Sequence, residues 1–166
     1  MSPEVIEETP ALNVNWRGVI LGALIAALTF LVIFMATAPL MGLHTFEPIQ
    51  MMAAIVLGPQ ILDRPPTFDL GVFAVAMAIH LILSLLYTSV IAVWVRERPP
   101  TQALGLGLLL GMAIYMLNFY VFIPAYPWFY AARDLITIAI HLVFGGVAAA
   151  VYVAIEQGWR RVVPQT

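Results

Sequence analysis

Residues 70–95 read LGVFAVAMAIHLILSLLYTSVIAVWV and carry no Asp, Glu, Lys or Arg. At about 1.5 Å of rise per residue, a helix of this length crosses the roughly 30 Å hydrocarbon core of a bilayer. The run contains Ala78-Ile79-His80-Leu81, and the same four residues return at 139–142 inside another long apolar run. A histidine at membrane depth is costly without a partner, so this repeated motif is the main functional lead in the sequence.

The composition indicates an integral membrane protein. Of the 166 residues, 63% are hydrophobic and 10% are charged, and the mean hydropathy is +0.98, outside the usual range of soluble domains. Every basic side chain is an arginine, and no run of them is long enough to bind nucleic acid. The absence of cysteine excludes disulfides, thiolate catalysis and sulfur-ligated metals. We expect the lipid bilayer to be the partner that surrounds the chain.

Four apolar runs predict four transmembrane helices, and therefore an all-α polytopic membrane protein built as a four-helix bundle. The expected spans are residues 17–41, 70–95, 102–123 and 134–157. Residues 1–16 form an acidic segment whose charge is wrong for a signal peptide, so we expect the first helix to stay in the mature protein. Residues 96–101 form the expected inner turn, where Thr101 can cap the third span, and residues 158–166 form a tail.

The arginines predict the orientation of these helices in the membrane. Those on one side are Arg17, Arg96, Arg98, Arg160 and Arg161, whereas Arg64 and Arg133 lie on the other. The side that is richer in arginine normally faces the cytoplasm. We therefore expect a multi-pass protein of the bacterial inner membrane with both termini in the cytoplasm.

An internal duplication relates residues 17–95 to residues 102–157. Aligning Gly22 with Gly107 also pairs Phe34 with Phe119 and Pro39 with Pro124, and aligning His80 with His141 pairs the two Ala-Ile-His-Leu copies. Each half is then a helical hairpin that starts on the same side, so we expect two tandem parallel repeats about a pseudo-two-fold axis. Small residues suited to close helix packing occur in both halves: Gly18, Gly22, Ala26, Gly107, Gly111 and Gly145.

The loop after the first span holds a short apolar segment at residues 48–58. The segment is too short to cross a bilayer and ends at Gly58-Pro59, so we expect an interfacial or re-entrant helix. Nearby His44, Glu47 and Asp63 are interpreted as solvated residues and not as a metal site, because no second histidine is close in sequence.

His80 and His141 allow two interpretations. In the first, the two imidazoles bind the iron of a b-type haem whose propionates reach Arg64 and Arg133. In the second, they are hydrogen-bonded to polar neighbours and stabilise helix packing only. Both interpretations place the two side chains at a similar depth, where the expected repeat lets them face each other.

Several polar side chains are expected at this depth: His80, Ser84, Asn118, Thr137 and His141. A set of this kind can line a path for a small solute through a homo-oligomeric transporter or channel. No span carries an acidic residue at depth, so proton coupling would rest on the histidines. We find no nucleophile paired with a base, and we therefore expect no catalytic residue, no metal site and no enzyme activity.

Several runs of residues resemble a group of small four-helix bacterial inner-membrane proteins. The runs are 53–58, 67–72, 118–120, 127–129 and 141–145, and the similarity covers most of residues 17–152. The resemblance implies the same architecture. The group has no established activity, so the resemblance assigns no functional residue, and the sodium:proline symporter label of some members does not suit a chain with four helices.

The sequence thus predicts a non-enzymatic integral membrane protein, a structural or accessory subunit that associates with other membrane proteins or with itself. Two alternatives remain open. One is a haem b electron carrier that uses His80 and His141, and the other is a small-solute transporter or channel.

Overall fold

The computed structural model describes residues 14–162, and side chains up to residue 158. Within this range every regular element is helical. The α-helices are α1 (Trp16–Thr37), α2 (Glu47–Leu57), α3 (Leu70–Val95), α4 (Pro100–Met116) and α5 (Leu135–Val162). Shorter elements are η1 (Ala38–Met41), η2 (Pro59–Asp63), the π-helix η3 (Leu117–Phe122) and η4 (Pro127–Ala132). Most of the acidic segment predicted for residues 1–16, and the end of the tail predicted for residues 158–166, lie outside the described residues.

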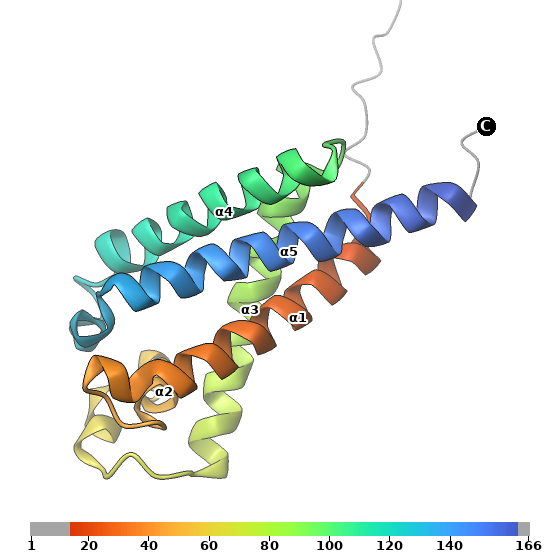
Figure 1. Ribbon diagram of the computed structural model, residues 1–166. Coiled ribbons are helices and arrows are strands. Elements are labelled where there is room, and N and C mark those ends of the chain that lie inside the picture. The colour runs from red at the N-terminus through yellow and green to blue at the C-terminus, as the bar shows by residue number, and fades with distance from the viewer. Residues whose placement is uncertain (1–13, 163–166) are drawn as a thin grey trace, which may run out of the picture.

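Four helical segments are long and apolar enough to cross a membrane, which confirms the prediction of an all-helical chain with four candidate membrane spans. They are Trp16–Met41, Leu70–Val95, Pro100–Phe122 and Leu135–Gly158. Their arrangement is shown in Figure 1, where α5 lies between α4 and α1 and both run antiparallel to it. The helix α3 packs mainly against α1 and α2.

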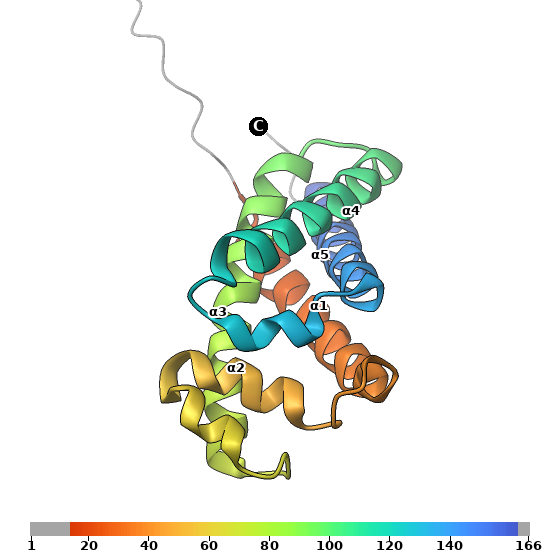
Figure 2. The same ribbon diagram turned by 90° about the vertical axis from the view of Figure 1, so that its left-hand side faces the viewer.

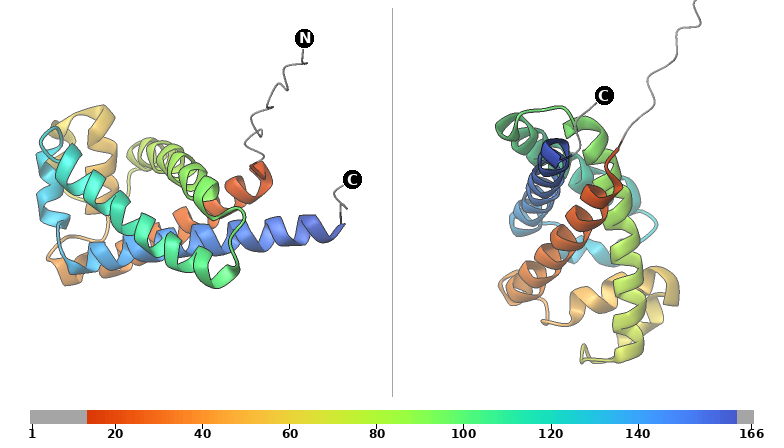
Figure 3. Two further views of the ribbon diagram at one scale, coloured as in Figure 1. Left: turned by 90° about the horizontal axis from the view of Figure 1, so that it is seen from above. Right: turned by 90° about the vertical axis from the view of Figure 1, so that its right-hand side faces the viewer.

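The start of α1, the turn from α3 to α4 and the end of α5 lie together, and we name this the termini end of the bundle (Figure 3). Viewed from the side in Figure 2, α2 and the short turns gather at the opposite end, which we name the α2 end. Both predicted hairpins therefore have their connecting segments at the α2 end. Which side of a membrane each end faces stays a prediction.

Local signals explain where most helices begin. The carboxylate of Asp69 accepts a hydrogen bond from the backbone of Val72 at 3.0 Å, and that of Asp134 accepts one from Thr137 at 2.8 Å. These side chains satisfy backbone donors that the first turn of a helix leaves unpaired. The expected cap at Thr101 is wrong, because α4 begins at Pro100, whose fixed φ and missing N–H suit the first helical position.

The third span differs from a continuous α-helix. Residues 102–123 were expected to form one helix, but α4 ends at Met116 and the chain continues as a π-helix through Phe122. A π-helix is rare and is found mostly as a short insertion, frequently at functional sites. Asn118, one of the predicted polar residues, lies in this π-helical segment.

Helices α4 and α5 touch through their backbones. A Cβ atom added at Gly107 would lie 2.5 Å from the carbonyl oxygen of Gly145, and one added at Gly111 would collide with the carbonyl oxygen of His141. On the other side of α5, a Cβ at Gly22 would lie 3.2 Å from the carbonyl oxygen of Ala148. The structure thus places small residues from both halves against α5, where close approach gains van der Waals contact in lipid.

The two remaining small residues lie on the same face of α1. A Cβ added at Gly18 would lie 2.9 Å from the ring of Tyr152, and Ala26 is fully buried in the apolar cluster between α1, α3, α4 and α5. This cluster fills the termini end of the bundle with side chains such as Ile91 and Val95. The termini end is therefore the well-packed half of the bundle.

The helix α2 packs against α3, and the described residues between α4 and α5 contain no α-helix. Its backbone carbonyl at Met51 accepts a hydrogen bond from the indole of Trp128 at 2.9 Å, and Gln50 donates to the carbonyl of Pro65 at 3.2 Å. The helix ends at Gly58, whose φ of 86° favours glycine. Its position relative to a membrane surface stays a prediction.

The packing is unequal between the two halves. A pseudo-two-fold axis would give α3 and α4 the same contact that α1 makes with α5, yet α3 contacts mainly α1 and α2. The inserted helix α2 occupies part of the α3 surface, which is a physical reason for the difference. The tandem parallel repeat therefore stays a prediction from the sequence.

We expect the substitution Gly111→Ala to lower the free energy of unfolding by about 1–3 kcal/mol, because the added methyl group meets the α5 backbone. The matched control is Gly105→Ala on the same helix, where a Cβ would meet no atom within 4 Å. This control should be neutral or stabilising by up to about 1 kcal/mol. Unfolding of both variants in detergent, followed by circular dichroism, measures the difference, and equal stabilities would contradict the described crossing.

Candidate polar site and adjoining cavity

The side chain of His141 is 4% exposed and has partners for both ring nitrogens. Its Nδ1 atom lies 2.8 Å from the carbonyl oxygen of Thr137, one turn earlier in α5. A carbonyl oxygen can only accept, so Nδ1 carries the proton in the neutral ring. The Nε2 atom is then an acceptor, and it faces the amide nitrogen of Asn118 at 3.4 Å.

Asn118 connects His141 to a third element. Its amide nitrogen donates to His141, and its amide oxygen accepts a hydrogen bond from the hydroxyl of Tyr87 on α3 at 2.5 Å. Donors and acceptors match along the whole series, which we name the Tyr87–Asn118–His141 chain. It links α3, the π-helix η3 and α5 by side-chain hydrogen bonds, the kind that holds helices together in lipid.

His80 makes a different contact. Its Nε2 atom lies 3.0 Å from the carbonyl oxygen of Ala27 on α1, so Nε2 carries the proton in the neutral ring. The side chain is 7% exposed and ties α3 to α1. Although both histidines belong to the same four-residue motif, they hold opposite tautomers, assigned from their hydrogen bonds.

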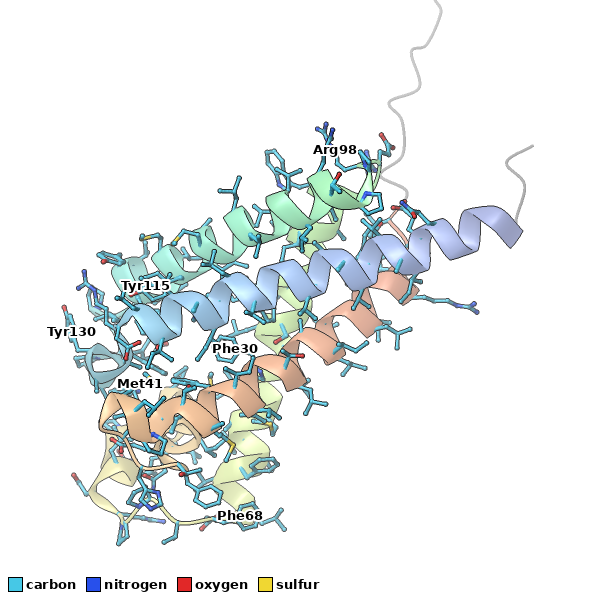
Figure 4. All side chains as sticks on the ribbon, in the orientation of Figure 1. Phe30, Met41, Phe68, Arg98, Tyr115 and Tyr130 are labelled. Atoms are coloured by element: carbon cyan, nitrogen blue, oxygen red, sulfur yellow. The ribbon has the colours of Figure 1, made fainter. Side chains whose placement is uncertain are left out.

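The aromatic ring of Phe30 packs against both imidazoles. Its centroid lies 5.4 Å from that of His80 and 4.9 Å from that of His141, where the rings meet edge to face. Phe30 projects from α1 toward α5 in Figure 4. Phe30 thus forms a shared aromatic contact of the two histidines. Sequence reasoning missed Phe30, although it continues the spacing of Gly18, Gly22 and Ala26 along one face of α1.

A cavity of about 270 Å³ lies on the α2 side of this group. Most of its lining is aromatic or aliphatic, including Phe34, Ile79, Phe119 and Phe122, and side chains from α1, α2, α3, η3, η4 and α5 contribute. A second cavity of about 50 Å³ adjoins it and reaches His80 and Ser84. The Tyr87–Asn118–His141 chain lines both cavities.

The structure brings most of the predicted polar residues together. His80, Ser84, Asn118 and His141 all line the smaller cavity. The side chain of Thr137 is fully buried and does not line either cavity, and its hydroxyl has no hydrogen-bond partner within the described residues. Thr137 contributes its backbone carbonyl to His141 instead.

Other polar residues have different roles. In the loop before α2, the backbone of His44 donates to the carboxylate of Glu47 at 2.9 Å, which is a local contact at the start of the helix. Residues 14–162 contain no group of three His, Cys, Asp or Glu side chains placed to hold a metal ion. Near the end of α5, Glu156 is 6% exposed, a burial that sequence reasoning missed.

The arrangement can be compared with the needs of a bis-histidine haem. Such a group needs one nitrogen of each imidazole directed at the iron, with room for a flat macrocycle between the rings. Here Phe30 contacts both rings, and each Nε2 atom already has a hydrogen-bond partner. Haem binding would therefore require Phe30 and both hydrogen bonds to rearrange.

We expect Tyr87→Phe and Asn118→Leu to be energetically coupled, because they remove two ends of one hydrogen bond. Interhelical hydrogen bonds in membrane proteins average about 0.6 kcal/mol and reach about 1.7 kcal/mol. A double-mutant cycle on unfolding free energies should give a coupling in that range. The pair Ser89→Ala and Asn118→Leu is the control, since the Ser89 hydroxyl bonds to its own helix at Leu85. Equal coupling in both cycles would contradict the assigned chain.

Compared with known proteins, the chain matches no protein-family model, no curated protein sequence and no solved structure. No residue role can be transferred from another protein by these comparisons. The features that bear on function are the polar site, the cavity and the outer surfaces of the four apolar helices.

Proposed function

We propose that this protein is a non-enzymatic component of a membrane complex, a structural or accessory subunit that associates with other membrane proteins. The observation that supports this proposal is that the buried polar side chains form hydrogen bonds between helices. His80 bonds to α1, and His141 bonds to Asn118 and through it to α3. Groups that are costly in a bilayer are thus used to join helices, and this stabilises one arrangement of the bundle.

The outer surfaces support the accessory role. Helix α3 is the least covered of the spans, with 17% of its most apolar window buried, compared with 50% for α5. Its outward side chains are large and apolar, among them Ile82, Leu86 and Val90. A face of this kind contacts lipid or the apolar helix of another subunit, and α3 therefore offers the widest surface for association.

Native gel electrophoresis and photo-crosslinking test the accessory role. A photoreactive amino acid at Leu86, which is 57% exposed, should crosslink to other membrane proteins when introduced into cells. The same residue at Ile91 on α3, which is fully buried, should give no intermolecular product. Migration only as a free monomer, with no product from Leu86 or from exposed Leu109 on α4, would contradict the proposal.

A visible absorption spectrum distinguishes the haem alternative from the accessory role. Because Phe30 packs against both imidazoles, we expect purified protein from haem-supplemented cells to give no reduced-minus-oxidised difference spectrum. A haem spectrum that is lost in both His80→Ala and His141→Ala would overturn this expectation and assign the redox role.

The transport alternative is tested by measuring solute flux in proteoliposomes. The packed cluster at the termini end contains Phe144, which also lines the smaller cavity, so a path would need the helices beyond it to separate. We expect proteoliposomes to show no solute flux that Asn118→Leu alters. Flux that depends on Asn118 would assign a transport role.

A further inference from the structure

The larger cavity has the size of a binding site for a small apolar molecule. An engineered cavity of about 150 Å³ in another protein binds benzene, whereas this one is partly open and has a volume of about 270 Å³. Ligand pockets start at about 300 Å³ and are lined mainly by apolar and aromatic groups with a few placed polar groups. The cavity lies just below this range in volume and agrees with it in lining, since aromatic rings form much of the wall. Tyr87, Asn118 and His141 form one polar place, and Tyr126 adds a further hydroxyl.

That polar place has hydrogen-bonding capacity left over. The side-chain nitrogen of Asn118 carries two N–H donors, and one of them is used by His141. The hydroxyl of Tyr87 donates its proton to Asn118 and keeps lone pairs that can accept. A ligand with an oxygen at this position would accept the second N–H of Asn118, which an apolar occupant would leave unpaired.

The backbone around Asn118 is a second, independent observation. Residues Leu117–Phe122 form the π-helix, and three of them, Asn118, Phe119 and Phe122, line the larger cavity. Short π-helical segments occur frequently at functional sites. Here the altered pitch is confined to the part of the third span that faces the cavity.

Part of the cavity wall comes from the apolar segments that are long enough to span a membrane. The lining residue Phe122 is 46% exposed on the outer surface of the bundle, and Ile79 of α3 lines the same cavity. Both belong to segments that are long and apolar enough to span a bilayer. A lipid-soluble molecule therefore suits this position better than a water-soluble one, because apolar spans form much of the lining.

We propose that this cavity binds a lipid-soluble molecule with a planar ring that carries a carbonyl oxygen, a quinone being the simplest case. The ring packs among Phe34, Phe119 and Phe122, and the oxygen accepts a hydrogen bond from Asn118. The site is independent of the accessory role, because it needs only the folded chain.

The test uses a benzoquinone with a decyl tail as the probe and Trp128 as the reporter. Trp128 lies next to the cavity residue Phe129, with ring centroids 6.2 Å apart, and quinones quench indole fluorescence at short range. Changing Trp16, Trp94 and Trp159 to phenylalanine leaves Trp128 as the reporter. We expect quenching that saturates with probe concentration, together with a rise in the melting temperature of the unaltered protein.

Two variants and a matched control locate the site. Leu83→Phe fills the cavity and should weaken binding at least tenfold, whereas Ile82→Phe, on the outward face of the same helix, should leave it unchanged. Asn118→Leu removes the donor and should weaken binding about tenfold, a loss that corresponds to one hydrogen bond. Because Asn118 also holds helices together, Leu83→Phe keeps the test valid if Asn118→Leu fails to fold.

Three results would overturn the proposal. The first is quenching that rises linearly with probe and shows only partition into detergent. The second is equal affinity in Leu83→Phe and Ile82→Phe. The third is displacement of the quinone by a ring-free methyl ester of a fatty acid at equal concentration, which would identify the occupant as a lipid acyl chain.

Discussion

The contact between the backbones of α4 and α5 at Gly107, Gly111 and Gly145 is the interaction on which the rest of this bundle depends. No side chain larger than hydrogen fits at these positions, so the two helices approach as closely as backbones allow. Gly111 meets the carbonyl of His141, and Asn118 lies two turns further along the same span. The glycine contact therefore fixes the distance at which Asn118 and His141 can share a hydrogen bond.

A single spacing in the sequence accounts for much of this geometry. In the third span the buried residues recur every fourth position: Ala103, Gly107, Gly111, Tyr115, Phe119 and Ile123. An α-helix has about 3.6 residues per turn, so such a stripe drifts around the helix unless the pitch changes. The π-helix at Leu117–Phe122 widens the turn at the end of the stripe and keeps Phe119 and Ile123 buried. Buried residues recur at the same spacing in α3, at Ala76, His80, Ser84, Thr88 and Ala92. This helix crosses behind α1 and α5 in Figure 1.

Composition and apolar run length were sufficient to predict the four spans, because the requirement to satisfy backbone groups in lipid leaves helices as the main choice. The caps at Asp69 and Asp134 depend only on residues close in sequence, because each is a local hydrogen bond. The π-helix could not be predicted, because no local signal marks it and its side chains meet residues distant in sequence, such as His141. The contact of Phe30 with both histidines depends on the rotation of α1, α3 and α5 about their axes. The apolar pattern alone leaves that rotation undetermined in helices that are hydrophobic on all sides.

The central position of α5 also has a consequence for biogenesis. Synthesis proceeds from the N-terminus, so α1, α3 and α4 enter the bilayer before the helix that covers the small-residue faces of α1 and α4. Until α5 is present, those faces lack the helix that covers most of them in the folded bundle. Assembly of this bundle is thus completed by its last helix, and a ribosome that stops before Leu135, or a protease that removes α5, leaves three helices without their common partner.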